Sequence, residues 1–325
     1  MSSKTLILMV AISVAVGTLL ACEAPETEPE VQRPPTDRIA PLSDGAVGVS
    51  LLGERLLVDP ATSGDAYDNL LAAETHYQNN PDDVDAIIWY GRRLAYTGRY
   101  IEAINAFSEG MERFPDEPRL YRHRGHRFLS LRMLDRAIED LEYATTLFHG
   151  QEDVIEPDGN PNVRNTPVSS LQINTWYHLA LSHYVKGDFE EALEEWRECL
   201  KVSVNPDMLA ATTHWLYMTL RRMGRNAEAE EVLESVTPGM DVFENQAYYH
   251  CVLFYRGDMT LEEIYAERSN VLAYMFEGTH YGIGNWHYYN GDEEEAREIF
   301  QEIVDAPGWG SFAAITAEAD LARMN

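Results

Sequence analysis

The fold is decided by residues 173–200, which read INTWYHLALSHYVKGDFEEALEEWRECL. Four side chains of the first half recur at the i, i+3, i+4 and i+7 spacing of one helix face: Trp176, Leu179, Ala180 and His183. Four of the second half share that spacing: Phe189, Ala192, Leu193 and Trp196. Gly187 lies between the halves and can adopt the positive φ with which many helices end. The stretch therefore predicts two amphipathic helices joined by a tight turn.

The same pattern repeats along the chain. Its turn recurs at five further positions: Gly98, Arg132, Gly224, Gly257 and Gly291. Units then begin near six residues: Val84, Pro118, Ile173, Ala210, Phe243 and Glu277. Four of the five steps between these starts are 33 to 37 residues, and the second is 55 residues. Residues 149–172 are therefore predicted to be a loop insertion.

This repeat resembles the tetratricopeptide repeat (TPR), a helix–turn–helix of about 34 residues. Small residues recur on the first helix of the units: Gly91, Gly125, Ala180 and Gly284. They recur on the second helix as well: Ala103, Ala137, Ala192, Ala229 and Ala296. A larger side chain at such a crossing would push the two helices apart, because packed cores tolerate added volume poorly. The unit from Phe243 departs from the pattern, and its second helix (260–268) is expected to be rebuilt.

Two further helices are expected outside the six units. Residues 65–79 have helical spacing, and residues 311–324 follow the stop signal Ala306-Pro307-Gly308. A stacked solenoid needs a cap at each open end. We therefore predict an all-α fold over residues 47–325, an α-solenoid of about six TPR-like helix–turn–helix units with a helical cap at each end.

The N-terminus predicts an anchored protein. Residues 1–21 contain an apolar run that is too short to span a membrane comfortably, which is typical of a signal peptide. The tetrad Leu-Leu-Ala-Cys ending at Cys22 resembles a bacterial lipobox, so Cys22 would carry lipid and become the first mature residue. The alternative is a plain secretory peptide with an incidental Cys. The resemblance implies a bacterial cell-envelope location, with the outer membrane (periplasmic or surface face) preferred over the inner.

Residues 22–46 are rich in Pro and acidic side chains, so we expect a disordered tether between the lipid and the folded part. The net charge of −29 argues against nucleic acid and against an anionic membrane surface as partners. Contact with the membrane is expected only through the lipid on Cys22.

Catalytic and metal-binding patterns are absent from the sequence. His123 and His126 share a helix face, and His178 and His214 occupy similar positions in consecutive units, but zinc needs three or four converging ligands. There is no HExxH, CxxC, GxSxG or Gly-rich phosphate loop. An enzyme would require these four histidines to converge with an acid or a metal. We expect no enzymatic activity, no cofactor and no metal.

One segment of the insertion begins like a calcium-binding loop, with D-x-N-x-N at residues 158–162. The sixth position of that loop is Val163 where Gly is needed, and the twelfth is Ser169 where Glu is needed. We therefore reject an EF-hand, while calcium binding of another kind stays open. A long loop in a repeat array is more often functional than decorative, so it could fold over one edge of the groove and contact ligand.

By the TPR resemblance, the first helix of each unit lines a concave groove. The positions carried over are rich in Arg, aromatic residues and His: Trp89, Arg92, Tyr96, Arg122, His123, His126, Tyr177, His178, Tyr184, His214, Trp215, Arg221, Arg222, Tyr248, Tyr255, Tyr281, Asn285 and Tyr288. Arg and aromatic side chains are enriched at binding hot spots, and the Arg fork matches carboxylates. The alternative is that these side chains only pack each helix against the next unit.

The resulting hypothesis is a lipid-anchored TPR scaffold that binds a protein or peptide, with acidic peptides favoured, in cell-envelope assembly. The alternative function is a surface glycan- or nutrient-binding lipoprotein that stacks sugars on Tyr and Trp. For the groove, we predict that replacing Arg122 and Arg222 by Glu abolishes partner binding and leaves the fold intact.

Overall fold

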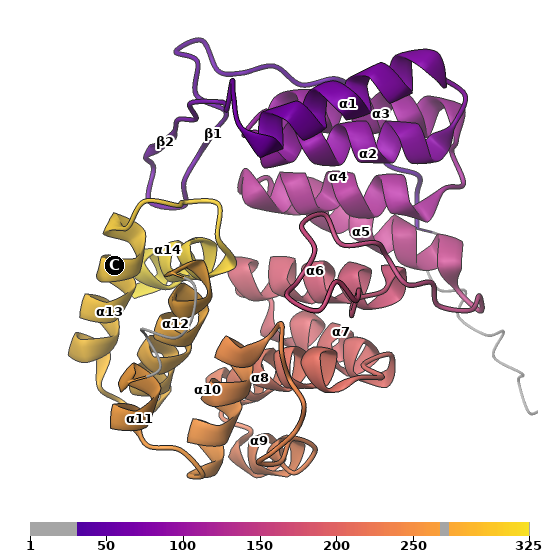
Figure 1. Ribbon diagram of the computed structural model, residues 1–325. Coiled ribbons are helices and arrows are strands. Elements are labelled where there is room, and N and C mark those ends of the chain that lie inside the picture. Colours follow the sequence, from indigo (N-terminus) through magenta and orange to yellow (C-terminus); the bar gives the residue numbers. More distant parts are fainter. Residues whose placement is uncertain (1–30, 267–272, 325) are drawn as a thin grey trace, which may run out of the picture. The chain divides into compact units, whose positions relative to one another are not determined.

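The computed structural model describes residues 31–266 and 273–324. From residue 84 onwards, antiparallel helix pairs follow one another along the chain (Figure 1). The first helices of the pairs are α2 (Val84–Tyr96), α4 (Pro118–Ser130), α6 (Leu171–Lys186), α8 (Pro206–Arg222), α10 (Gln246–Arg256) and α12 (Ala273–Tyr289). Their partners are α3 (Tyr100–Arg113), α5 (Leu134–Phe148), α7 (Phe189–Lys201), α9 (Asn226–Leu233), α11 (Leu261–Ala266) and α13 (Glu293–Asp305). The predicted all-α solenoid of TPR-like units is confirmed.

Every predicted turn between the two helices of a unit has a residue with positive φ. Five of these residues are glycines, with φ between 71° and 96°, and the sixth is Arg132 with φ 60°. A non-glycine residue in this region costs roughly 1–2 kcal/mol. The Arg132 side chain therefore has to contribute something that glycine cannot, and its contacts are described below.

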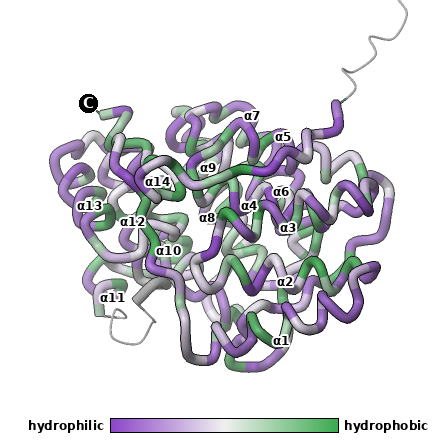
Figure 2. The backbone as a smooth tube through the Cα atoms, turned by 90° about the horizontal axis from the view of Figure 1, so that it is seen from above, coloured by the Kyte–Doolittle hydropathy of each residue, from purple (hydrophilic) through white to green (hydrophobic). Residues whose placement is uncertain are grey.

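The small residues lie where the helices of a pair cross. A Cβ atom on Gly91 would lie 2.4 Å from the Phe107 ring, and one on Gly125 would lie 2.7 Å from Leu141. The alanines at the matching positions of the second helices are fully buried. The second helices α7 and α13 alternate hydrophilic with hydrophobic residues, as expected for helices with one face in solvent (Figure 2).

Both predicted end helices are present. Helix α1 (Asp65–Asn79) packs on α2, and a short hairpin of β1 (Gly48–Val49) and β2 (Arg55–Leu56) precedes it. Helix α14 (Phe312–Met324) packs on α12 and α13 of the sixth unit. It also contacts α6, the first helix of the third unit. Residues 313–321 are all buried. Helix α14 is thus an internal helix as well as a cap.

The second helix of the fifth unit is described only over α11 (Leu261–Ala266), which ends where the described residues end. Its one buried side chain in this part is Ile264. That this helix is rebuilt therefore stays a prediction.

Residues 32–46 are extended but bound to the helices, so the expectation of a free tether is wrong for this part. The Arg33 Nη2 atom donates to the Met111 carbonyl at 2.6 Å. The Asn105 side chain donates to the carbonyl of Ile39 and accepts from its N–H, both at 2.9 Å. These bonds satisfy a backbone that a Pro-rich composition alone would leave solvated.

The predicted signal peptide, the predicted lipidation site Cys22 and the first part of the tether lie outside the described residues. In the described part, no helix has both the length and the apolar character needed to cross a membrane.

Candidate functional site

The insertion folds back across the first helices of the units. It carries an antiparallel bridge between Ile155 and Ser170. Arg92 and Arg93 of α2 donate to its Pro157 and Gly159 carbonyls at 2.8 and 2.9 Å. We call the side of α2, α4, α6, α8, α10 and α12 that faces the insertion and α14 the inner face.

The far part of the insertion reaches the N-terminal end of α10. Asn162 donates to the Glu244 carboxylate at 2.8 Å, and Arg164 pairs with Asp241 at 2.6 Å. The insertion thus spans from the first unit to the fifth. Its own polar side chains hold it on the inner face.

Glu156 of the insertion binds the groove arginine of the second unit. Its carboxylate lies 3.1 Å from Arg122 Nη2 and 3.4 Å from His123 Nε2, and it accepts from Asn174 at 2.5 Å. The Glu156 residue is only 5% exposed. The chain therefore neutralises Arg122 with its own acid.

Helix α14 covers the other end of the inner face. Asp320 is fully buried and forms an ion pair with Arg222, and it accepts from the Tyr281 hydroxyl at 2.9 Å. Asn285 accepts from Arg222 at 2.9 Å and donates to the Tyr184 hydroxyl at 3.0 Å. These five polar side chains form one buried network, so they stabilise α14 instead of facing a partner.

Half of the predicted groove residues are therefore packing residues. Nine have under 9% of their surface exposed: Arg122, His123, His178, Tyr184, His214, Trp215, Tyr255, Tyr281 and Asn285. Arg221, Arg222 and Tyr288 contact their own neighbours, with the Arg222 guanidinium 4.0 Å from the Tyr288 ring centre. These positions are buried because α14 and the insertion occupy the inner face that a partner would otherwise use.

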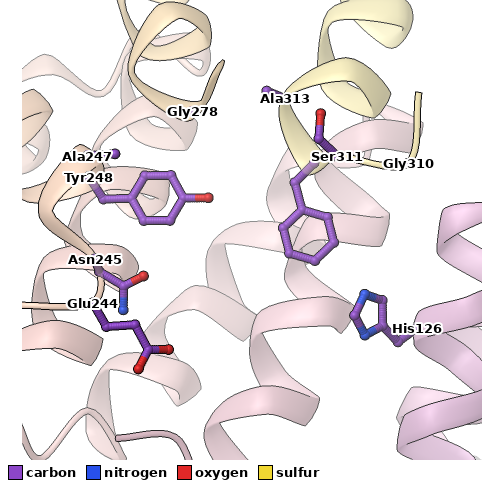
Figure 3. A pocket seen from close by; sticks show the side chains of 10 residues that line it. His126, Glu244, Asn245, Ala247, Tyr248, Gly278, Gly310, Ser311 and Ala313 are labelled. Atoms are coloured by element: carbon purple, nitrogen blue, oxygen red, sulfur yellow. The ribbon is translucent and has the colours of Figure 1, made fainter. Parts of the chain in front are cut away.

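Five of the predicted groove residues line a cavity that the insertion and α14 leave open. Two adjoining hollows of about 350 and 280 Å³ share His126, Glu244, Asn245, Tyr248 and Phe312, and we call them together the central cavity. Figure 3 shows Tyr248 and Glu244 across the cavity from Ser311 and His126. The predicted residues that line the central cavity are Arg122, His126, Tyr177, His178 and Tyr248.

The sequence interpretation missed the contributions of α10 and α14 to this cavity. Phe312 and Ser311 begin the helix that was expected only as an end cap, and Glu244 and Asn245 precede α10. A signal was available in α14, whose run of Ala and Thr suits a helix packed closely on all sides. Nothing in the local sequence indicates that α14 faces α4.

The central cavity is mostly uncharged. Burial, and after it the charge of Arg127, holds the pKa of His126 well below its usual value, and burial with Arg122 does the same for the pKa of His178. The two imidazole rings lie 4.0 Å apart. Burial also raises the pKa of Glu244. The cavity therefore offers aromatic faces, neutral imidazoles, the carboxyl group of Glu244 and the guanidinium of Arg122, which is paired with Glu156.

The four histidines do not form one cluster. His126 and His178 are adjacent, while the His123 ring stacks on Phe107 at 5.6 Å and His214 stacks on Tyr248 at 4.8 Å. Within residues 31–266 and 273–324, no group of three His, Cys, Asp or Glu side chains is placed to hold a metal ion.

Two further hollows continue the row along α4 and α2. A small one of about 100 Å³, which we call the basic pocket, is lined by Arg92, Ala95, Tyr96, Phe107, Arg122, His123, His126 and Arg127. It shares Arg122 and His126 with the central cavity. An outer hollow of about 540 Å³ between α2 and the insertion includes Trp89, Arg92 and Glu156. Neighbouring hollows thus share lining residues from the first unit to the fifth.

Comparison with known proteins agrees with the repeat architecture. The tetratricopeptide repeat family profile matches residues 173–203. No curated protein matches the chain. Among solved structures, the TPR protein YrrB, described as having an unusual peptide-binding site, is 14% identical and covers 78% of this chain and 96% of its own, with a TM-score of 0.42.

Two other solved structures are similar at the same low level. MamA from AMB-1 is 16% identical over 52% of this chain and 86% of its own, with a TM-score of 0.38. The TPR domain of P58(IPK) is 15% identical over 80% of this chain and 94% of its own, with a TM-score of 0.22. The helix pairs define an all-α solenoid, and one of its units, residues 173–203, matches the tetratricopeptide repeat.

Proposed function

We propose that this chain is a non-catalytic scaffold, anchored by lipid at a bacterial envelope membrane, that binds a short segment of a protein partner along the row of hollows on its inner face. One observation carries the proposal. The chain fills most of the inner face with its own insertion and α14, yet it leaves the central cavity, the basic pocket and the outer hollow open.

The central cavity has the size and chemistry for side chains of such a segment. Its two parts of about 350 and 280 Å³ are within or just below the range of roughly 300–1,000 Å³ that ligand sites occupy. Tyr248 and Phe312 provide apolar faces, and Asn245 and Glu244 provide polar groups that fix orientation. An aromatic or aliphatic anchor of the partner would be the main source of affinity.

The anchor and the location rest on the N-terminal sequence. Leu-Leu-Ala-Cys ends at Cys22, and the packed part of the chain begins near residue 32. A linker of about ten residues leaves the folded part within a few tens of ångströms of the lipid. A scaffold held at that distance suits the assembly of envelope proteins.

A crosslinked pull-down tests the proposal. Glu244→Lys puts a longer, oppositely charged side chain into the central cavity, and Glu139→Lys makes the same charge change on the exposed side of α5. We expect one envelope protein to be enriched with wild type and with Glu139→Lys and to be lost with Glu244→Lys. Equal enrichment with all three chains would show that the central cavity is not the binding site.

A glycan-binding lipoprotein is the second candidate, favoured by the aromatic faces next to open space. Tyr96 is 39% exposed beside the basic pocket, and Trp89 lines the outer hollow. A glycan array probed with the same chains separates the two functions. Saturable binding of a sugar without protein enrichment would favour this candidate.

A further inference from the structure

Three of the residues that line the basic pocket carry a buried polar atom that the protein leaves unsatisfied. Arg92 Nε, Arg122 Nε and His123 Nε2 are buried and have no hydrogen-bond partner. All three residues line the basic pocket. Buried polar groups without partners are costly and rare, so three in one small hollow call for an explanation.

All three atoms are donors. A guanidinium has no acceptor, so its Nε can only donate. Arg122 Nη1 lies 2.7 Å from His123 Nδ1, which must accept, and the proton of the neutral imidazole is then on Nε2. His123 Nε2 is 3.4 Å from Glu156 but does not have hydrogen-bond geometry to it. The residues around the basic pocket therefore carry three unused N–H groups, which need acceptors.

The pocket also carries more positive than negative charge. Arg127 lines it without an ion pair or hydrogen bond among the described residues, and its guanidinium is 5.9 Å from the Tyr100 ring centre. Burial, together with Arg122 and Arg92, lowers the pKa of Arg127 to about 10. In the part of the chain that the structure describes, Glu156 is the only carboxylate within ion-pair distance of Arg92, Arg122 or Arg127.

This charge runs against the rest of the chain. The protein has a net charge of −29, and most of its other arginines are paired with acids. The basic pocket is lined by three guanidinium groups and by no acid, and Glu156, which pairs with Arg122 from outside the lining, offsets one of the three charges. Asp158 of the insertion interacts with Arg92 at longer range but does not line the pocket.

We propose that the basic pocket is a binding site for a phosphate-type dianion, held by Arg92, Arg122 and Arg127 with His123 as a further donor. The donors come from α2 and α4, so they approach the pocket from separate helices. A tetrahedral dianion offers acceptors in all those directions and balances the two excess charges. A carboxylate offers two coplanar oxygens, and Glu156 already supplies one carboxylate on one side.

The size of the pocket limits the ligand to one such group. Its volume of about 100 Å³ is well below the roughly 300–1,000 Å³ of sites for drug-sized ligands, so it suits a single small group. The group can be free inorganic phosphate or the phosphate of a monoester whose remainder lies in the neighbouring hollows. The basic pocket is one of the row of hollows named in the proposed function, but the anion site does not depend on a partner, because phosphate binds the basic pocket of the chain alone.

Calorimetric titration of the full chain in detergent tests the site. Inorganic phosphate, phosphoserine and acetate are titrated in chloride buffer at constant ionic strength, so that general screening is the same in each run. We expect saturable 1:1 binding of phosphate and no comparable binding of acetate. Binding of phosphoserine as well would identify the monoester as a source of the group, and its absence would identify the free anion.

Two variants and one control locate the binding. Arg127→Gln removes a charge that has no ion pair or hydrogen bond in the described structure, and Arg92→Gln, which also removes the bond to the Pro157 carbonyl, is the second variant should the first alter folding. Each is expected to weaken phosphate about tenfold or more, because each removes charge-assisted hydrogen bonds. Arg99→Gln, at the residue before α3, removes a charge that is paired with Glu102 and is expected to bind like wild type. No saturable binding by wild type, acetate bound as well as phosphate, or equal affinity in all variants would overturn the proposal.

Discussion

At the scale of the residue, Arg222 shows how burial changes the role of a groove position. Its side chain is 4% exposed and pairs with the fully buried Asp320. Replacing Arg222 by Glu would place two acids together in the core. The structure therefore reverses the expectation that Arg222 can be changed to Glu with the fold intact. We predict that Arg222→Glu lowers the free energy of unfolding by about 3–5 kcal/mol, measured by urea denaturation.

Arg225 provides the matched control for Arg222. It lies three residues further along the chain, has a side chain that is 35% exposed, and pairs with Glu228 at 2.6 Å. Exposed pairs of this kind contribute little. Arg225→Glu should leave the urea midpoint nearly unchanged, and an equal loss in both variants would mean that burial does not explain the effect.

His214 gives the fold a pH dependence. Burial lowers the pKa of His214 to about 3, and its ring is stacked between Tyr248 and Tyr255. In the unfolded chain the imidazole takes up a proton near pH 6.5, so its contribution is complete above pH 6.5 and falls as the pH falls towards 3. At pH 5 the loss from this one group is about 2 kcal/mol.

Replacing His214 by Phe should remove that part of the pH dependence. The aromatic ring is kept, while the titrating nitrogen and the unpartnered Nε2 are removed. We predict that the variant loses about 2 kcal/mol less than wild type between pH 7 and pH 5, measured by urea denaturation at both values. His149→Gln, at an exposed histidine, serves as the control and should follow wild type.

At the scale of the element, Arg132 explains how α14 is held. Its guanidinium binds the Glu318 carboxylate through two contacts, at 3.0 and 2.5 Å, and both side chains are at most 4% exposed. The turn before α5 thus reaches α14 through a residue that occupies a glycine conformation. Fixing α14 compensates for the unfavourable φ of Arg132.

The Arg132→Gly variant separates two effects of Arg132 on stability, that of its backbone conformation and that of its side-chain ion pair. Glycine suits a φ of 60°, which favours the variant by roughly 1–2 kcal/mol. The lost ion pair leaves Glu318 buried and charged, which costs about 3–5 kcal/mol. We predict a net loss of stability, seen as a lower melting temperature in calorimetry. Adding Glu318→Gln should restore part of it, and a variant as stable as wild type would contradict the role given to α14.

The elements themselves could be predicted from the sequence because their signals are local. The six turns and the small residues at helix crossings depend on φ and on close contact, and each is visible within one unit. In the second unit, the repeat spacing even identified Arg132, which is not a glycine, as the turn residue. The partners of the inner-face side chains are not local, since Arg132 and Glu318 are 186 residues apart in the chain.

At the scale of the whole molecule, the inner face is occupied from both ends of the sequence. Glu156 reaches Arg122 from the insertion, and Asp320 reaches Arg222 from α14. Helical spacing correctly indicated which residues face inwards, but it contains no information on what lies opposite. Of the predicted groove residues, Arg122, His126, Tyr177, His178 and Tyr248 line the central cavity, and their role in binding stays a prediction.

The lipid anchor is the remaining expectation at this scale, and Cys22→Ser tests it. The two other cysteines, Cys199 and Cys251, are fully buried, so Cys22 is the thiol left for modification. We predict that Cys22→Ser abolishes incorporation of an alkyne-labelled fatty acid and moves the chain from the membrane to the soluble fraction. Cys199→Ser, the control, should keep both label and membrane location. Since Cys22 lies before the packed residues, the melting temperature of Cys22→Ser should equal that of wild type, and a labelled, membrane-bound Cys22→Ser chain would place the anchor elsewhere.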